Sequence, residues 1–208
     1  MNNGFKKVDT IVEVNLKKKR LPKWLFGSVA AAAILTAGFN TSQTMAQNEA
    51  ELERLSIDKG SIVQTDTEKL LSVGHYVAET AASSSLTIDY ETIDKEKDMV
   101  ITLPSLFKND QYIARISDYI VEQMRQEMKA TNQEKTYWVS GAGLEDEELV
   151  DLFTTIKANQ NFYVTEEGKL VVVFDEYEVA PGYMGVVEFE IPIKILADIL
   201  VSNEYIHD

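Results

Sequence analysis

The residue types that usually carry catalysis or bind metals are scarce in this chain of 208 residues. There is no cysteine, which excludes disulfides, thiol catalysis and Cys-ligated zinc. The two histidines, His75 and His207, are far apart in sequence, so no two-histidine metal motif is present. No nucleophile elbow, phosphate-binding loop, dinucleotide fingerprint or EF-hand loop occurs either. With 34 Asp and Glu, close carboxylate pairs arise by chance. The sequence therefore predicts a binding protein without cofactor or metal, not an enzyme.

One segment, Glu176–Met184, has the composition of a binding loop. It contains a turn at Pro181 and Gly182, with Tyr177 and Tyr183 on either side. Aromatic side chains held in a rigid turn give contact area at a low cost in entropy. The alternative is a structural turn whose tyrosines pack on a sheet. On its residues alone the segment is more typical of the structural turn, because most Pro-Gly turns have only that role.

The N-terminal segment combines a basic stretch with an apolar one. Residues 1–23 carry seven Lys and Arg, and residues 24–48 carry no charge. Residues 24–46 reach the length of a membrane-spanning helix, and the positive-inside rule places residues 1–23 in the cytoplasm and the rest outside. The same segment also fits a signal peptide that is cut before Gln47, with Thr44 and Ala46 at the −3 and −1 positions. A signal anchor with a latent cleavage site would satisfy both interpretations.

Charge is unevenly distributed along the chain. The net charge is −14, although the first 23 residues are basic, so the remaining residues are strongly acidic. Such a body would repel nucleic acid and would attract a cationic partner. Acidity that serves only solubility is the simpler alternative.

Hydrophobic spacing predicts an α+β fold. We expect an antiparallel sheet of about six strands with two to three helices packed on one face, preceded by a single N-terminal transmembrane helix. The expected strands lie at 71–78, 86–91, 99–103, 162–165, 169–175 and 185–191. A helix is expected from Asn109 or Asp110 to about Met128, a short one from Leu144, and a last one from Pro192. The expected regions are a cytoplasmic segment at 1–23, a membrane span at 24–46, a spacer at 47–60 and an extracytoplasmic domain at 61–208.

Four segments carry a resemblance to a known family. Thr92–Lys95, Leu103–Lys108, Gln123–Met128 and the long run Phe174–Gly185 resemble the RsiV-like family of membrane-spanning anti-sigma factors. The resemblance implies that a cytoplasmic segment holds an extracytoplasmic-function sigma factor and that the outer domain binds lysozyme. It also implies that lysozyme exposes a site to signal peptidase, after which an intramembrane site-2 protease frees the sigma factor.

The resemblance assigns roles to particular residues. It places lysozyme contacts at Ser84, Pro181, Gly182 and Tyr183, and the signal-peptidase site at Thr44, Ala46 and Gln47. The family's cytoplasmic part is longer, and here Val8–Leu16 resembles its end, which assigns sigma-factor contacts to Val8, Ile11 and Val12. A secreted or anchored lysozyme-binding inhibitor without transcriptional output is the main alternative. An envelope domain with a different ligand is a third.

Overall fold

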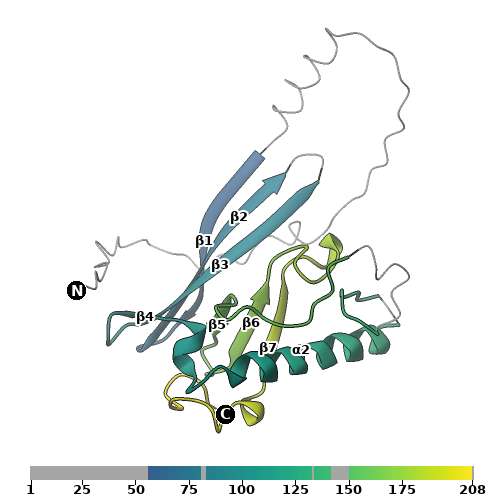
Figure 1. Cartoon of the computed structure of the whole chain (residues 1–208). Coiled ribbons are helices and arrows are strands. Elements are labelled where there is room, and N and C mark those ends of the chain that lie inside the picture. The colour runs from purple at the N-terminus through teal and green to yellow at the C-terminus, as the bar shows by residue number, and fades with distance from the viewer. Residues whose placement is uncertain (1–55, 81–82, 133, 142–149, 208) are drawn as a thin grey trace, which may run out of the picture.

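Two antiparallel sheets and one long helix make up the part of the chain that the structure describes (Figure 1). The structure is a computed structural model and describes residues 56–80, 83–132, 134–141 and 150–207. The first sheet has the order β1 (Ser56–Asp66), β2 (Leu70–Thr80), β3 (Ser84–Asp94) and β4 (Met99–Ile101). The second has the order β5 (Phe162–Val164), β6 (Leu170–Phe174) and β7 (Val187–Ile191). The helix α2 (Gln111–Ala130) lies across the second sheet (Figure 1).

The first three strands form a long meander that extends beyond the rest of the described residues (Figure 1). β2 and β3 confirm two of the strands expected from alternating residues. β1 was not expected, because its first residues are polar and exposed and give no alternating apolar signal. These residues are held by the ladder with β2 instead of by burial. The sequence indicates a spacer over 47–60, whereas the structure has a strand from Ser56.

The second sheet lies at the centre of the fold. All five residues of β6 are buried, and they form the continuous apolar run typical of a strand covered on both faces. One face packs against α2, and the other carries Tyr163, Val171 and Val173 towards the first sheet. The hairpin between β5 and β6 and the strand β7 confirm the expected elements. Gly168 takes a positive φ of 74° in the hairpin turn, where glycine is favoured.

The helix α2 buries the face that its sequence predicts. Ile116, Ile120 and Met124 are fully buried against the second sheet, so the methionine belongs to the core. The Asn109 side chain accepts a hydrogen bond from the Gln111 backbone N–H at 3.0 Å, which satisfies one free donor at the helix start.

Two parts of the expected architecture are wrong. The strands form two sheets instead of one, because side chains and not a backbone ladder join β3 to the second sheet. The segment after Pro192 is a 3-10 helix, η5 (Ile193–Ile195), followed by turns instead of an α-helix. The chain turns away there because Leu200 forms a β-bridge with Phe107. The helix expected from Leu144 and the membrane span expected at 24–46 lie outside the described residues.

No helix among the described residues is long and apolar enough to cross a membrane.

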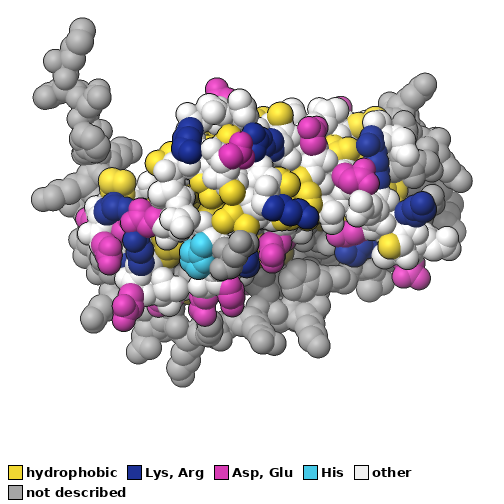
Figure 2. All heavy atoms as spheres, turned by 90° about the horizontal axis from the view of Figure 1, so that it is seen from below, with side chains coloured by type: hydrophobic (Ala, Val, Ile, Leu, Met, Phe, Trp, Pro, Cys, Tyr) yellow, Lys and Arg dark blue, Asp and Glu magenta, His cyan; other side chains and the backbone are white. Residues whose placement is uncertain are grey.

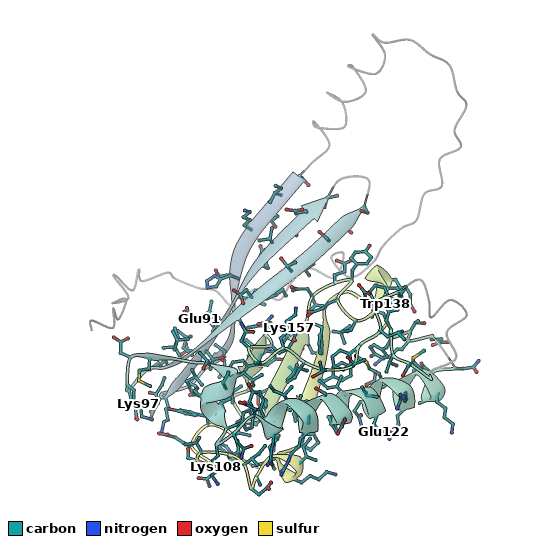
Figure 3. All side chains as sticks on the ribbon, in the orientation of Figure 1. Glu91, Lys97, Lys108, Glu122, Trp138 and Lys157 are labelled. Atoms are coloured by element: carbon teal, nitrogen blue, oxygen red, sulfur yellow. The ribbon has the colours of Figure 1, made fainter. Side chains whose placement is uncertain are left out.

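A buried carboxylate joins the C-terminal segment to the turn between β3 and β4. Asp94 accepts hydrogen bonds from the backbone N–H groups of Glu96 and Lys97 at 2.9 Å, and from the Tyr205 hydroxyl. The Lys97 ammonium lies 3.1 Å from the same carboxylate (Figure 3). Burial alone would raise the pKa of Asp94, but the bonds from Tyr205 and Lys97 outweigh it and hold the pKa well below its ordinary value.

Candidate functional site

The Asn161 side chain holds the outer edge of β3 against the second sheet. Its Oδ1 accepts a hydrogen bond from the Tyr90 N–H at 2.9 Å, and its Nδ2 donates to the Ile88 carbonyl. One amide therefore pairs with two backbone groups as a neighbouring strand would. The Tyr90 ring also packs on Tyr163, with 4.8 Å between ring centroids.

The loop that follows β6 continues this edge. The Asp175 carboxylate accepts a hydrogen bond from the Ile88 N–H at 2.9 Å, and the Glu176 N–H donates to the Leu86 carbonyl at 3.3 Å. The candidate loop, which we define as Glu176–Met184, thus starts in direct contact with β3. One backbone–backbone hydrogen bond and one bond to the Asp175 side chain therefore tie the start of the loop to the long hairpin that β2 and β3 form.

Two short turns shape the candidate loop. Glu178 closes the first one, because its N–H donates to the Asp175 carbonyl and its carboxylate accepts from the Asp175 N–H, both at 3.0 Å. Pro181 precedes the second one, the 3-10 helix η4 (Gly182–Met184). Tyr177 lies within the first turn and has a φ of +67°, in the left-handed region that a bulky side chain rarely adopts.

The loop buries its middle and exposes its two tyrosines. Val179 and Ala180 are buried in the core, whereas Tyr177 is 48% exposed and Tyr183 49% exposed. The Tyr177 ring covers the backbone of Gly182, where any Cβ would collide with it. The structural-turn alternative expects both tyrosines to pack on a sheet, and neither does so fully. Two half-exposed rings on a buried stem are suited to contacting a partner.

The segment after α2 supports the loop from one side. The Trp138 N–H donates to the Val179 carbonyl at 2.8 Å, and the Tyr183 hydroxyl donates to the Glu134 carbonyl at 3.3 Å. Figure 3 shows Trp138 at the same end of the molecule as the loop. Glu134 and Trp138 contribute backbone groups, which leave no pattern in the sequence, so their roles could not be found there.

Ser84 lies at the free end of the long hairpin. It is exposed and pairs with Thr80, which pairs in turn with Ser56 at the start of β1. The structure therefore groups Pro181, Gly182 and Tyr183 in one turn and places Ser84 two residues along β3 from Leu86, the residue bonded to that loop. Of the remaining assigned residues, none is described; these are Val8, Ile11, Val12, Thr44, Ala46 and Gln47.

Acidic groups flank the loop. Burial raises the pKa of Asp175, although its hydrogen bond from Ile88 works in the opposite direction. Burial likewise raises the pKa of Glu176. Glu178 pairs with Lys157 at 2.8 Å. On the face seen from below, by contrast, acidic and basic side chains of the described residues are interspersed (Figure 2).

The histidine and carboxylate side chains of the described residues do not form a metal site. His75 is exposed on β2, and its Nδ1 lies 2.9 Å from the Ser61 hydroxyl. Among the described residues, no three His, Asp or Glu side chains are grouped so that they could hold a metal ion.

Comparison with known proteins assigns the central part of the chain to a family. Residues 104–194, which run from η2 (Leu103–Leu106) to η5 and include α2, the second sheet and the loop, match the model described as "Protein of unknown function (DUF3298)". The chain carries a DUF3298 domain. Two solved DUF3298 proteins share the fold. The one from Bacteroides fragilis NCTC 9343 has a TM-score of 0.55 at 20% identity, over 78% of this chain and 64% of that one. The one from Pseudomonas aeruginosa PAO1 has a TM-score of 0.52 at 14% identity, over 79% of this chain and 72% of that one.

A curated relative extends the similarity beyond the DUF3298 domain. The anti-sigma-V factor RsiV of Bacillus subtilis (strain 168) is 49% identical over 152 residues, which are 73% of this chain and 51% of RsiV. The chain therefore spans about half the length of that relative. The resemblance noted in the sequence is confirmed as homology.

Proposed function

We propose that the chain is an anti-sigma factor that senses lysozyme by direct binding outside the cell. The proposal rests mainly on the candidate loop. Pro181 precedes the 3-10 turn of this loop, Tyr183 is half exposed, and the acidic residues Asp175 and Glu176 lie at the start of the loop. The identity of 49% with RsiV supports the anti-sigma role. An acidic body also suits lysozyme, which is a basic enzyme.

In this proposal each region has one task. Residues 1–23, with Val8, Ile11 and Val12, bind an extracytoplasmic-function sigma factor, and residues 24–46 cross the cell membrane. Residues 56–207 bind lysozyme. Signal peptidase then cuts between Ala46 and Gln47, and an intramembrane site-2 protease cuts next and releases the sigma factor. The free sigma factor then starts transcription of the stress response.

The hairpin register suggests how binding could reach the cleavage site. Only nine residues, 47–55, separate the cut from Ser56, which limits their reach to about 30 Å. Ser56 lies in the same row of the sheet as Ser84. A lysozyme molecule bound at Ser84 would thus lie close to the segment that signal peptidase must enter. Bound lysozyme increases the population of the arrangement that signal peptidase can cut only if lysozyme binds that arrangement more tightly than the protected one.

Calorimetry of the purified full-length chain with C-type lysozyme tests the binding step. Tyr183→Ala should weaken binding by about 2 kcal/mol or more, as for a buried aromatic anchor, and Pro181→Ala should weaken it by loosening the turn. Affinity should fall as salt rises, because screening shortens to about 8 Å at physiological ionic strength. Salt-independent binding, or unchanged affinity in the folded variants, would contradict the proposal.

N-terminal sequencing of the released domain tests the proteolytic step. We expect a new N-terminus at Gln47 that forms quickly with lysozyme and slowly without it. Thr44→Trp or Ala46→Trp should block the cut and leave lysozyme binding unchanged. Complete processing without lysozyme would instead favour the secreted inhibitor, an alternative that the small residues at Thr44 and Ala46 also fit.

A further inference from the structure

Two acidic residues, Asp175 and Glu176, take the place of a neighbouring strand along the outer edge of β3. The Asp175 carboxylate accepts a hydrogen bond from the Ile88 N–H at 2.9 Å, and the Glu176 N–H donates to the Leu86 carbonyl at 3.3 Å. The Leu86 backbone also stabilises the charged Glu176 carboxylate and opposes the burial that raises its pKa. We call these two residues the edge clamp, because they satisfy backbone groups that a free strand edge would expose.

The first sheet continues from the edge clamp to the start of β1. Leu86 on β3 pairs with Ala78 on β2, and Ala78 pairs with Asp58 on β1. Neighbouring strands lie about 4.8 Å apart, so this row reaches Asp58 about 10 Å from Leu86. Asp58 follows closely after Ser56, the first residue of β1. Backbone hydrogen bonds thus connect the start of the candidate loop with the start of β1 in a single row.

The rest of the candidate loop is held by contacts that lead elsewhere. The Val179 carbonyl accepts a hydrogen bond from the Trp138 N–H, and the Tyr183 hydroxyl donates to the Glu134 carbonyl. Val179 and Ala180 are buried in the core. These contacts join the loop to the segment after α2, whereas the edge clamp joins it to the long hairpin. Loss of the edge clamp should therefore leave the loop folded while separating its movement from that of the hairpin.

Asp175 serves this contact as a hydrogen-bond acceptor. The carboxylates of Glu178 and Asp89 repel its charge and, with burial, raise its pKa, although Lys157 works in the opposite direction. Lys157 itself pairs with Glu178 at 2.8 Å. The negative charge on Asp175 is thus poorly compensated, while its oxygen satisfies the Ile88 N–H. An amide oxygen at the same position could accept that bond without the charge.

We propose that the edge clamp couples lysozyme binding at the candidate loop to the arrangement of β1. By holding the loop and the hairpin together, Asp175 and Glu176 pass the arrangement that lysozyme selects at the loop along the row to β1. They are positioning residues, since they act through the loop and the hairpin. The coupling rests on the proposed function, because lysozyme is the partner and the cut before Gln47 is the output. Lysozyme changes that output only by preferring one arrangement.

The rate of the cut in the full-length chain tests the coupling. With membranes and signal peptidase, the readout is the ratio of the rate at saturating lysozyme to the rate without it. Asp175→Ala should lower this ratio about tenfold. Asp175→Asn keeps an acceptor for Ile88 and should stay within about twofold of the parent. Asp118→Ala, at an exposed position of α2, is the matched control and should leave the ratio unchanged.

Two further measurements separate coupling from mere stability. Saturating lysozyme removes effects on affinity, so a purely structural role of Asp175 would lower the melting temperature and leave the ratio intact. We expect Asp175→Ala to melt only about 2–4 °C below the parent. Hydrogen exchange of the Ile88 amide in the parent protein needs no variant. This amide should stay protected when lysozyme binds, because the edge clamp must persist in the bound state.

The outcomes distinguish the coupling from the proposed function. An Asp175→Ala ratio equal to that of Asp118→Ala, or an Ile88 amide that exchanges faster with lysozyme bound, would overturn the coupling and leave lysozyme sensing intact. An Asp175→Asn ratio as low as that of Asp175→Ala would overturn its basis in the hydrogen bond. A parent protein that does not bind lysozyme, or that is cut equally fast without it, would overturn the proposed function and the coupling with it.

Discussion

Asn161→Ala should loosen the long hairpin from the second sheet. The substitution removes the acceptor of the Tyr90 N–H and the donor to the Ile88 carbonyl. A fully buried backbone group left without a partner costs about 1–3 kcal/mol. Both groups here are partly buried, so water recovers some of that loss, and we expect the free energy of unfolding to fall by about 2–3 kcal/mol in total. The melting temperature should fall by about 5–10 °C.

Urea unfolding of the full-length chain measures this change, and two further variants locate its cause. Asn159→Ala removes an exposed amide two residues away and should change stability by less than about 0.5 kcal/mol. Asn161→Asp keeps an acceptor for Tyr90 but turns an ionised oxygen towards the Ile88 carbonyl. It should therefore be least stable at neutral pH and recover as the carboxyl is protonated. An Asn161→Ala protein as stable as the Asn159→Ala protein would refute the role of this amide.

Three further predictions concern other parts of the fold. Asp94→Asn should lower the free energy of unfolding by about 2–3 kcal/mol at pH 7. Because the pKa of Asp94 is lowered from 3.8, the parent should lose this stability as the pH falls below about 4, and pH-dependent urea melts of the variant should lack that loss. Ile116→Ala, in the fully buried face of α2, should cost about 2–5 kcal/mol by thermal or urea unfolding. Gly182→Ala should displace the exposed Tyr177 ring and so weaken lysozyme binding by about 1–2 kcal/mol in calorimetry, with little loss of stability.

The elements that could be predicted are those whose burial repeats with the period of the structure. Ile116, Ile120 and Met124 recur at helical spacing because one face of α2 meets the core, and β6 is continuously apolar because both its faces are covered. The exposed start of β1 lacks such a signal, since its partner is the backbone of β2. The last helix was wrongly expected because Leu196, Ile199 and Leu200 show helical spacing, yet they are buried by successive turns and a bridge to Phe107.

The loop was recognised from its composition, but its geometry was not. Pro181 and Gly182 indicate a turn, and Tyr183 suggests a contact. Nothing in the sequence shows that Tyr177 has a left-handed backbone or that its ring covers Gly182. The first depends on how Glu178 closes the first turn, and the second on how that turn lies against Gly182. Asn161 likewise has no distinguishing context in the chain, and only the fold brings it to the edge of β3.

A mechanical force applied through the residues that precede the domain acts first on Ser56, which is the first residue of an edge strand. A pull along the axis of β1 would load all of its pairs with β2 at once, in shear, whereas a pull across the sheet would peel them apart one after another. Peeling would begin at exposed pairs and meet more resistance past the irregularity between Val63 and Thr65, where Thr65 is buried and donates to the Val164 carbonyl. The direction of a pull on β1 thus decides how readily the strand detaches, so a partner bound beside Ser84 could change that resistance merely by tilting the hairpin.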